Sequence, residues 1–166
     1  MPSLVFFILA LIIALIHIGV SKSFSNKARR YELLTLYFLV FVIGLNGILD
    51  FFAHTVYAVQ TAESIGWPPN NPFQTEVAFA DLSYGIAGII CLWLRERFWL
   101  AVIIISGIFL FSAGAGHVYQ MIANNDGSVN NAGIVLYADL LTPIIGLILY
   151  YLYQKNSKDI TPLIKN

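Results

Sequence analysis

Charged residues and cysteine are both scarce in this chain, and each shortage excludes a class of protein. Only 11% of the 166 residues are charged, whereas 58% are hydrophobic, and a soluble domain averages about 25% charged residues. The composition therefore favours a protein of the lipid bilayer over a soluble one. The single cysteine, Cys91, excludes an internal disulfide. A net charge of zero gives no indication of a nucleic-acid partner.

Long apolar runs take the place of the missing charges. Five stretches are close to or above the roughly 20 residues that a helix needs to cross a bilayer. They lie at about 2–20, 33–60, 75–94, 98–122 and 132–153. Because only short connections remain between them, we expect a single membrane domain over residues 1–166, all-α and with five transmembrane helices.

Basic residues are absent from two of the four expected connections, which predicts the orientation in the membrane. The second (TAESIGWPPNNPFQ) and the fourth (NNDGSVNN) contain no Lys or Arg. The positive-inside rule then places the N-terminus outside the cytoplasm and the C-terminus inside it. No basic segment precedes the first apolar run, which argues for a retained helix over a cleaved signal peptide. His17 at the end of that helix is interpreted as an interfacial residue. All nine basic residues fit this orientation: Lys22, Lys27, Arg29, Arg30, Arg95, Arg97, Lys155, Lys158 and Lys165.

Two parts of the chain resemble each other. Residues 80–94 (ADLSYGIAGIICLWL) and 138–152 (ADLLTPIIGLILYYL) both begin with Ala-Asp-Leu, which matches Asp81 with Asp139. The segments FFAHTVY and AGAGHVY lie upstream of them and match His54 with His117. We expect a helical-hairpin repeat, about 33–94 and about 98–152, whose copies share one orientation and form a four-helix bundle. The N-terminal helix is then a peripheral addition.

The matched His and Asp residues are predicted to lie at one depth in the membrane. At 1.5 Å per residue, His54 and Asp81 lie about 10 Å from the outer ends of their helices, His117 about 9 Å and Asp139 about 12 Å. Ionisable groups inside a membrane are costly and indicate a functional site by default. Imidazole and carboxylate groups bind Zn, Mn or Fe. The preferred interpretation is a divalent metal site, open to the extracytoplasmic side, with these four residues as ligands.

Further polar residues extend from this layer. Asn46 and Asp50 precede His54 at intervals of four residues, so the three share one face of their helix. We interpret them as a support for the metal ligands or as part of an ion path that reaches the midplane of the membrane. Three more polar residues are assigned to the same support or path: Tyr57, Glu76 and Gln120.

Other interpretations of the same residues remain open. A proton or cation path along the Asn46–His54 face would make the protein a transporter or channel. His54 and His117 could instead be axial ligands of a b-type haem, although nearby carboxylates make a haem slot unfavourable. The His–Asp pairs could also be interhelical hydrogen bonds, worth about 1 kcal/mol each, in a small structural subunit. No nucleophile–base pair identifies an enzyme. The expected partners are lipid, further copies of the chain, or other membrane subunits.

The run AESIGWPPNNPFQTEVAFADLSYGIAGI, followed later by HVYQM, resembles an uncharacterised family of small prokaryotic multi-pass membrane proteins. The resemblance covers most of residues 50–140. It implies a five-helix protein of the cytoplasmic membrane and brings no activity with it. Size and helix layout are also loosely similar to the DoxX-like four-helix membrane proteins, but no motif supports a quinone reaction.

Overall fold

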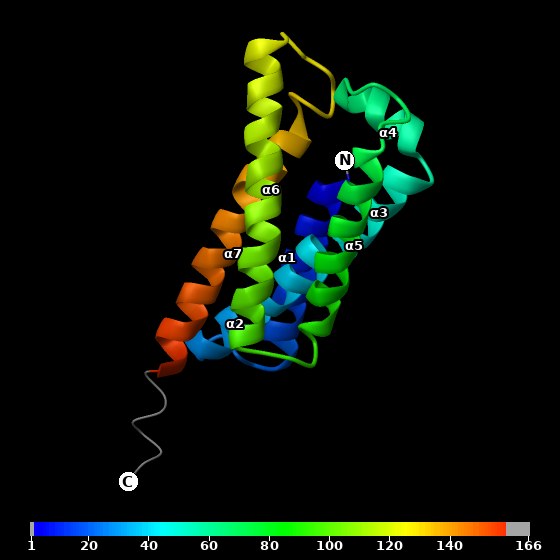
Figure 1. The fold of residues 1–166 in the computed structure, drawn as a ribbon. Coiled ribbons are helices and arrows are strands. Elements are labelled where there is room, and N and C mark those ends of the chain that lie inside the picture. Colours follow the sequence, from blue (N-terminus) through cyan, green and yellow to red (C-terminus); the bar gives the residue numbers. More distant parts are fainter. Residues whose placement is uncertain (1, 159–166) are drawn as a thin grey trace.

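The apolar segments of the chain form helices that lie side by side in the computed structural model, which describes residues 2–158 (Figure 1). No strand occurs within this range, so the prediction of an all-α fold is confirmed. Residues 1 and 159–166, and with them Lys165, lie outside the described residues. The elements are α1 (Pro2–Val20), α2 (Lys27–Tyr37), η1 (Phe38–Leu45), α3 (Asn46–Thr55), α4 (Ala58–Ile65), α5 (Phe73–Ile90), α6 (Arg97–Ala123) and α7 (Ile134–Lys158).

The second apolar segment is one continuous helix over 27–55, composed of α2, the π-helix η1 and α3. It begins before the predicted residue 33 because Asn26 caps it: the Asn26 side chain accepts a hydrogen bond from the Arg29 amide at 3.0 Å. It ends before the predicted residue 60 because Tyr57 leaves the helical conformation, with φ −109° and ψ 32°. The chain then resumes as the separate short helix α4.

Length and composition support four of the five predicted spans within the described part of the chain. The helices long and apolar enough to cross a membrane cover Ser3–Val20, Lys27–Thr55, Arg97–Ala123 and Ile134–Ser157. The fifth predicted span corresponds to α5, which has 18 residues. It carries Glu76 and Asp81, and these two carboxylates lower its apolar character.

Two helix pairs make the most extensive contacts, α3 with α5 and α6 with α7. Glycines set the distance between α5 and the long helix that it crosses. A Cβ on Gly88 would lie 2.6 Å from the Cα of Gly44, and a Cβ on Gly85 would lie 2.9 Å from the backbone nitrogen of Ile48. Small residues allow membrane helices to approach this closely. Helix α1 packs outside these pairs, against α2 and η1.

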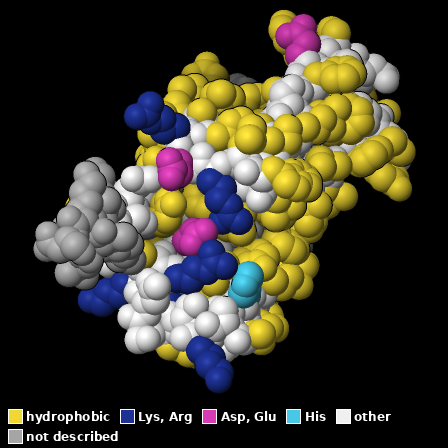
Figure 2. Space-filling model, turned by 90° about the horizontal axis from the view of Figure 1, so that it is seen from below, with side chains coloured by type: hydrophobic (Ala, Val, Ile, Leu, Met, Phe, Trp, Pro, Cys, Tyr) yellow, Lys and Arg dark blue, Asp and Glu magenta, His cyan; other side chains and the backbone are white. Residues whose placement is uncertain are grey.

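Lys and Arg side chains gather at one end of the bundle, which Figure 2 shows from below. This basic end carries the connections 21–26 and 91–96 and the end of α7. The opposite end, called the α4 end here, carries α4 and the connection 124–133 (Figure 1). The structure therefore separates the basic connections from those that lack Lys and Arg, as the sequence predicts.

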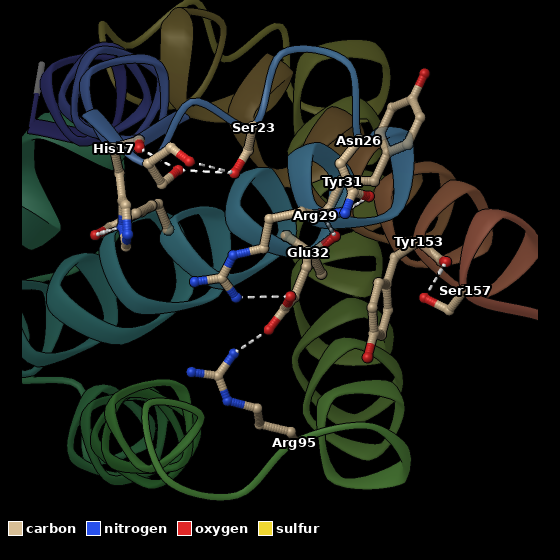
Figure 3. A network of polar contacts seen from close by, with 12 residues as sticks. His17, Ser23, Asn26, Arg29, Tyr31, Glu32, Arg95, Tyr153 and Ser157 are labelled. Atoms are coloured by element: carbon tan, nitrogen blue, oxygen red, sulfur yellow. Dashed lines mark hydrogen bonds and ion pairs between the residues drawn. The ribbon is translucent and has the colours of Figure 1, made fainter. Parts of the chain in front are cut away.

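A small polar network joins the helices at the basic end (Figure 3). The Glu32 carboxylate accepts hydrogen bonds from Arg29 and from Arg95, each at 2.7 Å, and so connects α2 to the α5–α6 connection. Such partly exposed ion pairs contribute about 0–1 kcal/mol each. His17 has a different partner, because its Nδ1 lies 2.9 Å from the hydroxyl oxygen of Tyr37.

Candidate functional site

A cavity of about 560 Å³ lies among the helices and extends to the α4 end. It is lined from helices far apart in the chain, including α3, α5, α6 and α7. Its volume is within the range of about 300–1,000 Å³ that is usual for small-molecule sites. The predicted site residues that line it are His54, His117, Asp81, Asp139, Asp50, Asn46 and Gln120.

The other two predicted site residues, Tyr57 and Glu76, are not among the lining residues. The Tyr57 side chain is 59% exposed, because the helix stops at Thr55 and the chain turns outward there. Glu76 lies in the first turn of α5 and is also exposed. The predicted site residues that lie deeper in the bundle therefore line the cavity, whereas the two predicted nearest the outer surface do not.

His117 and Asp139 form the one close His–carboxylate pair within residues 2–158. The Nε2 atom of His117 lies 3.5 Å from Oδ2 of Asp139, and its Nδ1 lies 2.7 Å from Oδ1 of Asn131. Asn131 is fully buried and donates from its Nδ2 to the backbone oxygen of Asp126 at 2.8 Å. That second bond fixes the orientation of the amide, so Oδ1 of Asn131 accepts and Nδ1 of His117 must carry a proton.

This proton assignment determines what can lie between His117 and Asp139. A neutral imidazole protonated at Nδ1 presents the lone pair of Nε2 to a carboxylate, which is repulsive. The distance of 3.5 Å is also longer than a normal N–H···O hydrogen bond of about 2.7–3.2 Å. The pair is therefore stable when a proton, on the ring or on the carboxyl group, or another cation lies between the two atoms.

The matched residues of the first hairpin, His54 and Asp81, have other partners. Asp81 is only 3% exposed and accepts a hydrogen bond from the Tyr84 hydroxyl at 2.6 Å. Nδ1 of His54 lies 3.3 Å from Nε2 of Gln74, which also donates to the backbone oxygen of Ala58 at 2.7 Å. Nδ1 of His54 is therefore the acceptor, the opposite of Nδ1 of His117. The two halves of the site are not chemically equivalent.

Asp50 is the third carboxylate of the cavity and lies one turn from His54, as the spacing predicts. Asn46 donates from Nδ2 to Oδ2 of Asp50 at 2.6 Å. The Oδ1 atom of Asn46 is buried and has no hydrogen-bond partner within the described chain. No Lys or Arg of the described residues lines the cavity. The described lining therefore holds three carboxylates and no Lys or Arg to balance their charge.

The four predicted metal ligands share the cavity without sharing one coordination point. Within residues 2–158, no group of three or more His, Cys, Asp or Glu side chains is placed to hold a metal ion. The haem interpretation fits the residues poorly, since Nε2 of His117 faces a carboxylate and Nδ1 bonds to Asn131. Nε2 is therefore the only ring nitrogen of His117 that could be an axial ligand, and it lies beside the Asp139 carboxylate.

At the α4 end, helix α4 and the residues that follow it are bonded to the connection 124–133. The Asn130 amide donates to the backbone oxygen of Ser64 and the Asn130 side chain donates to the Ser64 hydroxyl, each at 2.9 Å. Gly66, which has φ 84°, approaches the Asp126 carboxylate so closely that a Cβ would collide with it. Hydrogen bonds from the side chain and the amide of Ser128 lower the pKa of Asp126. Because Trp67 and Asn130 also line the cavity, these connections cover it at the α4 end.

Sequence reasoning missed four residues that shape this site. Tyr84 follows Asp81 by three positions, so helical spacing alone could have identified it as a neighbour. Trp67 was assigned only to a connection, yet its ring lies 6.4 Å from that of His54. Gln74 and Asn131 bond to histidines 20 and 14 positions away. No periodic pattern in the sequence signals those two contacts.

Comparison with other proteins gives a family and no activity. No curated protein and no solved structure matches this chain. The resemblance to an uncharacterised family is supported, whereas the loose likeness to DoxX-like proteins gains no support. A family of unknown function, DUF6790, matches residues 1–159, and the chain belongs to it.

Proposed function

We propose that this protein spans the membrane and binds a proton or another cation in the cavity, in exchange with the extracytoplasmic side. The observation that carries the proposal is the geometry of His117 and Asp139. Their facing atoms lie 3.5 Å apart, and the bond from Nδ1 of His117 to Asn131 supports a proton or another cation between them. A buried carboxylate without a compensating charge is very costly. The pair thus supplies a binding point for a cation.

The proposed arrangement in the membrane has five spans, with α5 as the shortest. At about 1.5 Å per residue, the 18 residues of α5 extend about 27 Å, close to the hydrocarbon thickness of about 30 Å. Asp81 is compatible with a span because it faces the cavity and is only 3% exposed. The basic end would lie in the cytoplasm. The hairpins 33–94 and 98–152 would then be parallel repeats whose polar residues have diverged.

A path for the cation is supported by the position of Asp50. This carboxylate lies on α3, one helical turn nearer the basic end than His54, and it lines the same cavity as Asp81 and Asp139. Carboxylates on three helices give a mobile proton successive positions. The paired ring and carboxylate of the second hairpin would be the first position reached from outside, and Asp50 the deepest.

A divalent metal ion is the second candidate. The bond from Nδ1 of His117 to Asn131 is the kind that orients a metal-binding histidine through its other nitrogen. Nε2 and the Asp139 carboxylate would then be the first two ligands. His54 or Asp81 would have to change side-chain conformation to become a third, since the described residues contain no preformed group of three.

The proposal is tested on protein purified in mild detergent and reconstituted in liposomes. A pH gradient with a trapped pH-sensitive dye measures proton movement, and mass spectrometry with a visible spectrum measures bound metal and haem. We expect Asp50→Asn and Asp139→Asn to abolish proton movement, while Glu76→Gln, an exposed change on α5, leaves it intact. About one Zn, Mn or Fe per chain, lost in Asp139→Asn, would instead support the metal site. Folded protein with neither property would refute the proton path and the metal site.

A further inference from the structure

We propose that the cation held in this cavity is a small organic amine in its protonated form, with an apolar group attached. This inference rests on the proposed cation binding and names the class of ligand. Its starting point is the size of the cavity. At about 560 Å³, the space is much larger than a bare metal ion with its ligands at about 2–2.6 Å would fill. It suits an organic molecule.

The carboxylates of the cavity and one unpaired amide oxygen favour a ligand that donates hydrogen bonds and carries positive charge. Asp81 receives one hydrogen bond within the described chain, from Tyr84, and its other carboxylate oxygen has no such donor. The buried Oδ1 of Asn46 also lacks a donor. A protonated amine brings up to three N–H donors and one positive charge. An ammonium nitrogen between Nε2 of His117 and Asp139 could donate to both.

The remaining walls suit the apolar part of such a ligand. The ring of Trp67 lies against that of His54, with 6.4 Å between ring centres, and Tyr84 lies against Phe109 at 5.7 Å. All of these rings line the cavity, together with aliphatic side chains such as Ile65 and Leu110. Aromatic faces attract a cation within about 6 Å. The cavity thus combines acidic groups with an apolar wall, as an amine bearing an apolar group requires.

Small residues of α6 provide a way in for a ligand with an apolar group. Ser112 and Gly116 line the cavity and are both exposed, and Ser112 also lines a shallow groove between α6 and α7. A Cβ at Gly116 would meet no atom within 4 Å. An amphiphilic amine could therefore enter from the outer half of the bilayer, past these two residues, without displacing the connections that cover the α4 end.

The test uses three probes of one shape. Benzylammonium carries charge and N–H donors, benzyltrimethylammonium carries charge alone, and benzyl alcohol is a neutral donor. Binding to the purified protein is followed by tryptophan fluorescence, and Trp67→Phe identifies the part of the signal that comes from the cavity. We expect saturable binding of benzylammonium, with both other probes at least about tenfold weaker, since a charge-assisted hydrogen bond is worth about tenfold to hundredfold in affinity.

Carboxylate variants give the second line of evidence. Asp81→Asn and Asp139→Asn should each weaken benzylammonium binding about tenfold or more, whereas Glu76→Gln on the same helix as Asp81 should not. Equal binding of all three probes, or no effect of either Asp variant, would overturn the inference. The comparison of probes on unaltered protein does not depend on any variant folding.

The same samples separate this inference from the function on which it rests. Proton movement or metal binding without any binding of benzylammonium would overturn the amine as ligand and leave the cation site standing. Absence of amine binding, proton movement and metal together would overturn both.

Discussion

The crossing of α5 over the long helix depends on Gly88, and substitution of that glycine by alanine should destabilise the bundle. The added Cβ would lie 2.6 Å from both the Cα and the nitrogen of Gly44 and 2.8 Å from the backbone oxygen of Leu39. Carbon atoms in contact lie at about 3.5–4.0 Å, so the helices would have to separate by about 1 Å. The obstructing atoms are backbone atoms, which cannot rotate away as a side chain can.

The expected cost follows from these distances. Overpacking in a filled interior costs about 1–3 kcal/mol, and backbone obstruction places Gly88→Ala near the upper value. The higher helix propensity of alanine offsets up to about 1 kcal/mol of this cost. The net loss should be about 2 kcal/mol. Separation of α5 would also enlarge the cavity, because Asp81 and Tyr84 are carried by the same helix.

Reversible unfolding in mixed detergent, followed by tryptophan fluorescence, measures this loss. Gly116→Ala is the matched control, because a Cβ at Gly116 meets nothing within 4 Å. The control should be as stable as the unaltered protein or more stable by up to about 1 kcal/mol. Equal unfolding midpoints for the two variants would refute the close crossing of these helices.

Three further predictions concern the connections. In a Cys91→Ser background, Ser64→Cys with Asn130→Cys should form a disulfide, because the two side chains are in contact. The disulfide should raise the free energy of unfolding by up to about 4 kcal/mol. Failure to cross-link would contradict the contact. A single cysteine at Asn70 should react with a membrane-impermeant maleimide added to intact cells, and reaction only after lysis would reverse the proposed orientation. The Asp126 carboxyl should titrate by NMR below the ordinary pKa of about 3.9, because its bonds to Ser128 lower its pKa in the folded protein. These bonds should persist at pH values above the ordinary pKa and weaken as the pH falls through the lowered pKa of the folded state.

Helical spacing explains which site residues could be predicted from the sequence. Asn46, Asp50 and His54 recur every four positions and therefore share a face, and that face lines the cavity. His117 and Asp139 were placed at one depth from the ends of their helices, and the structure brings them together. Helical periodicity and helix length can be read from a local stretch of sequence, and both signals are clear in so apolar a chain.

The remaining features depend on information that local patterns do not hold. The depth of a residue along a helix does not determine how the helix is rotated about its axis. Depth alone could therefore not predict that His54 contacts Gln74 instead of Asp81. The break before α4 has no Gly or Pro to signal it: Val56 and Tyr57 both bond back to the oxygen of Phe52. Asn131 reaches His117 from a connection whose path depends on its docking against Ser64. Each of these contacts is a product of tertiary packing.

The π-helix η1 sets the angular relation between the two halves of the long helix. It occupies Phe38–Leu45, directly before the polar residues of the long helix that line the cavity, and most of its side chains are buried. One residue in an α-helix corresponds to a turn of about 100°. Deletion of a single residue in this stretch would rotate Asp50 and His54 out of the cavity, although every polar side chain that lines it would still be present. The number of residues in η1 therefore determines which way Asp50 and His54 face. An insertion or deletion there would reorient this polar face without any substitution in it.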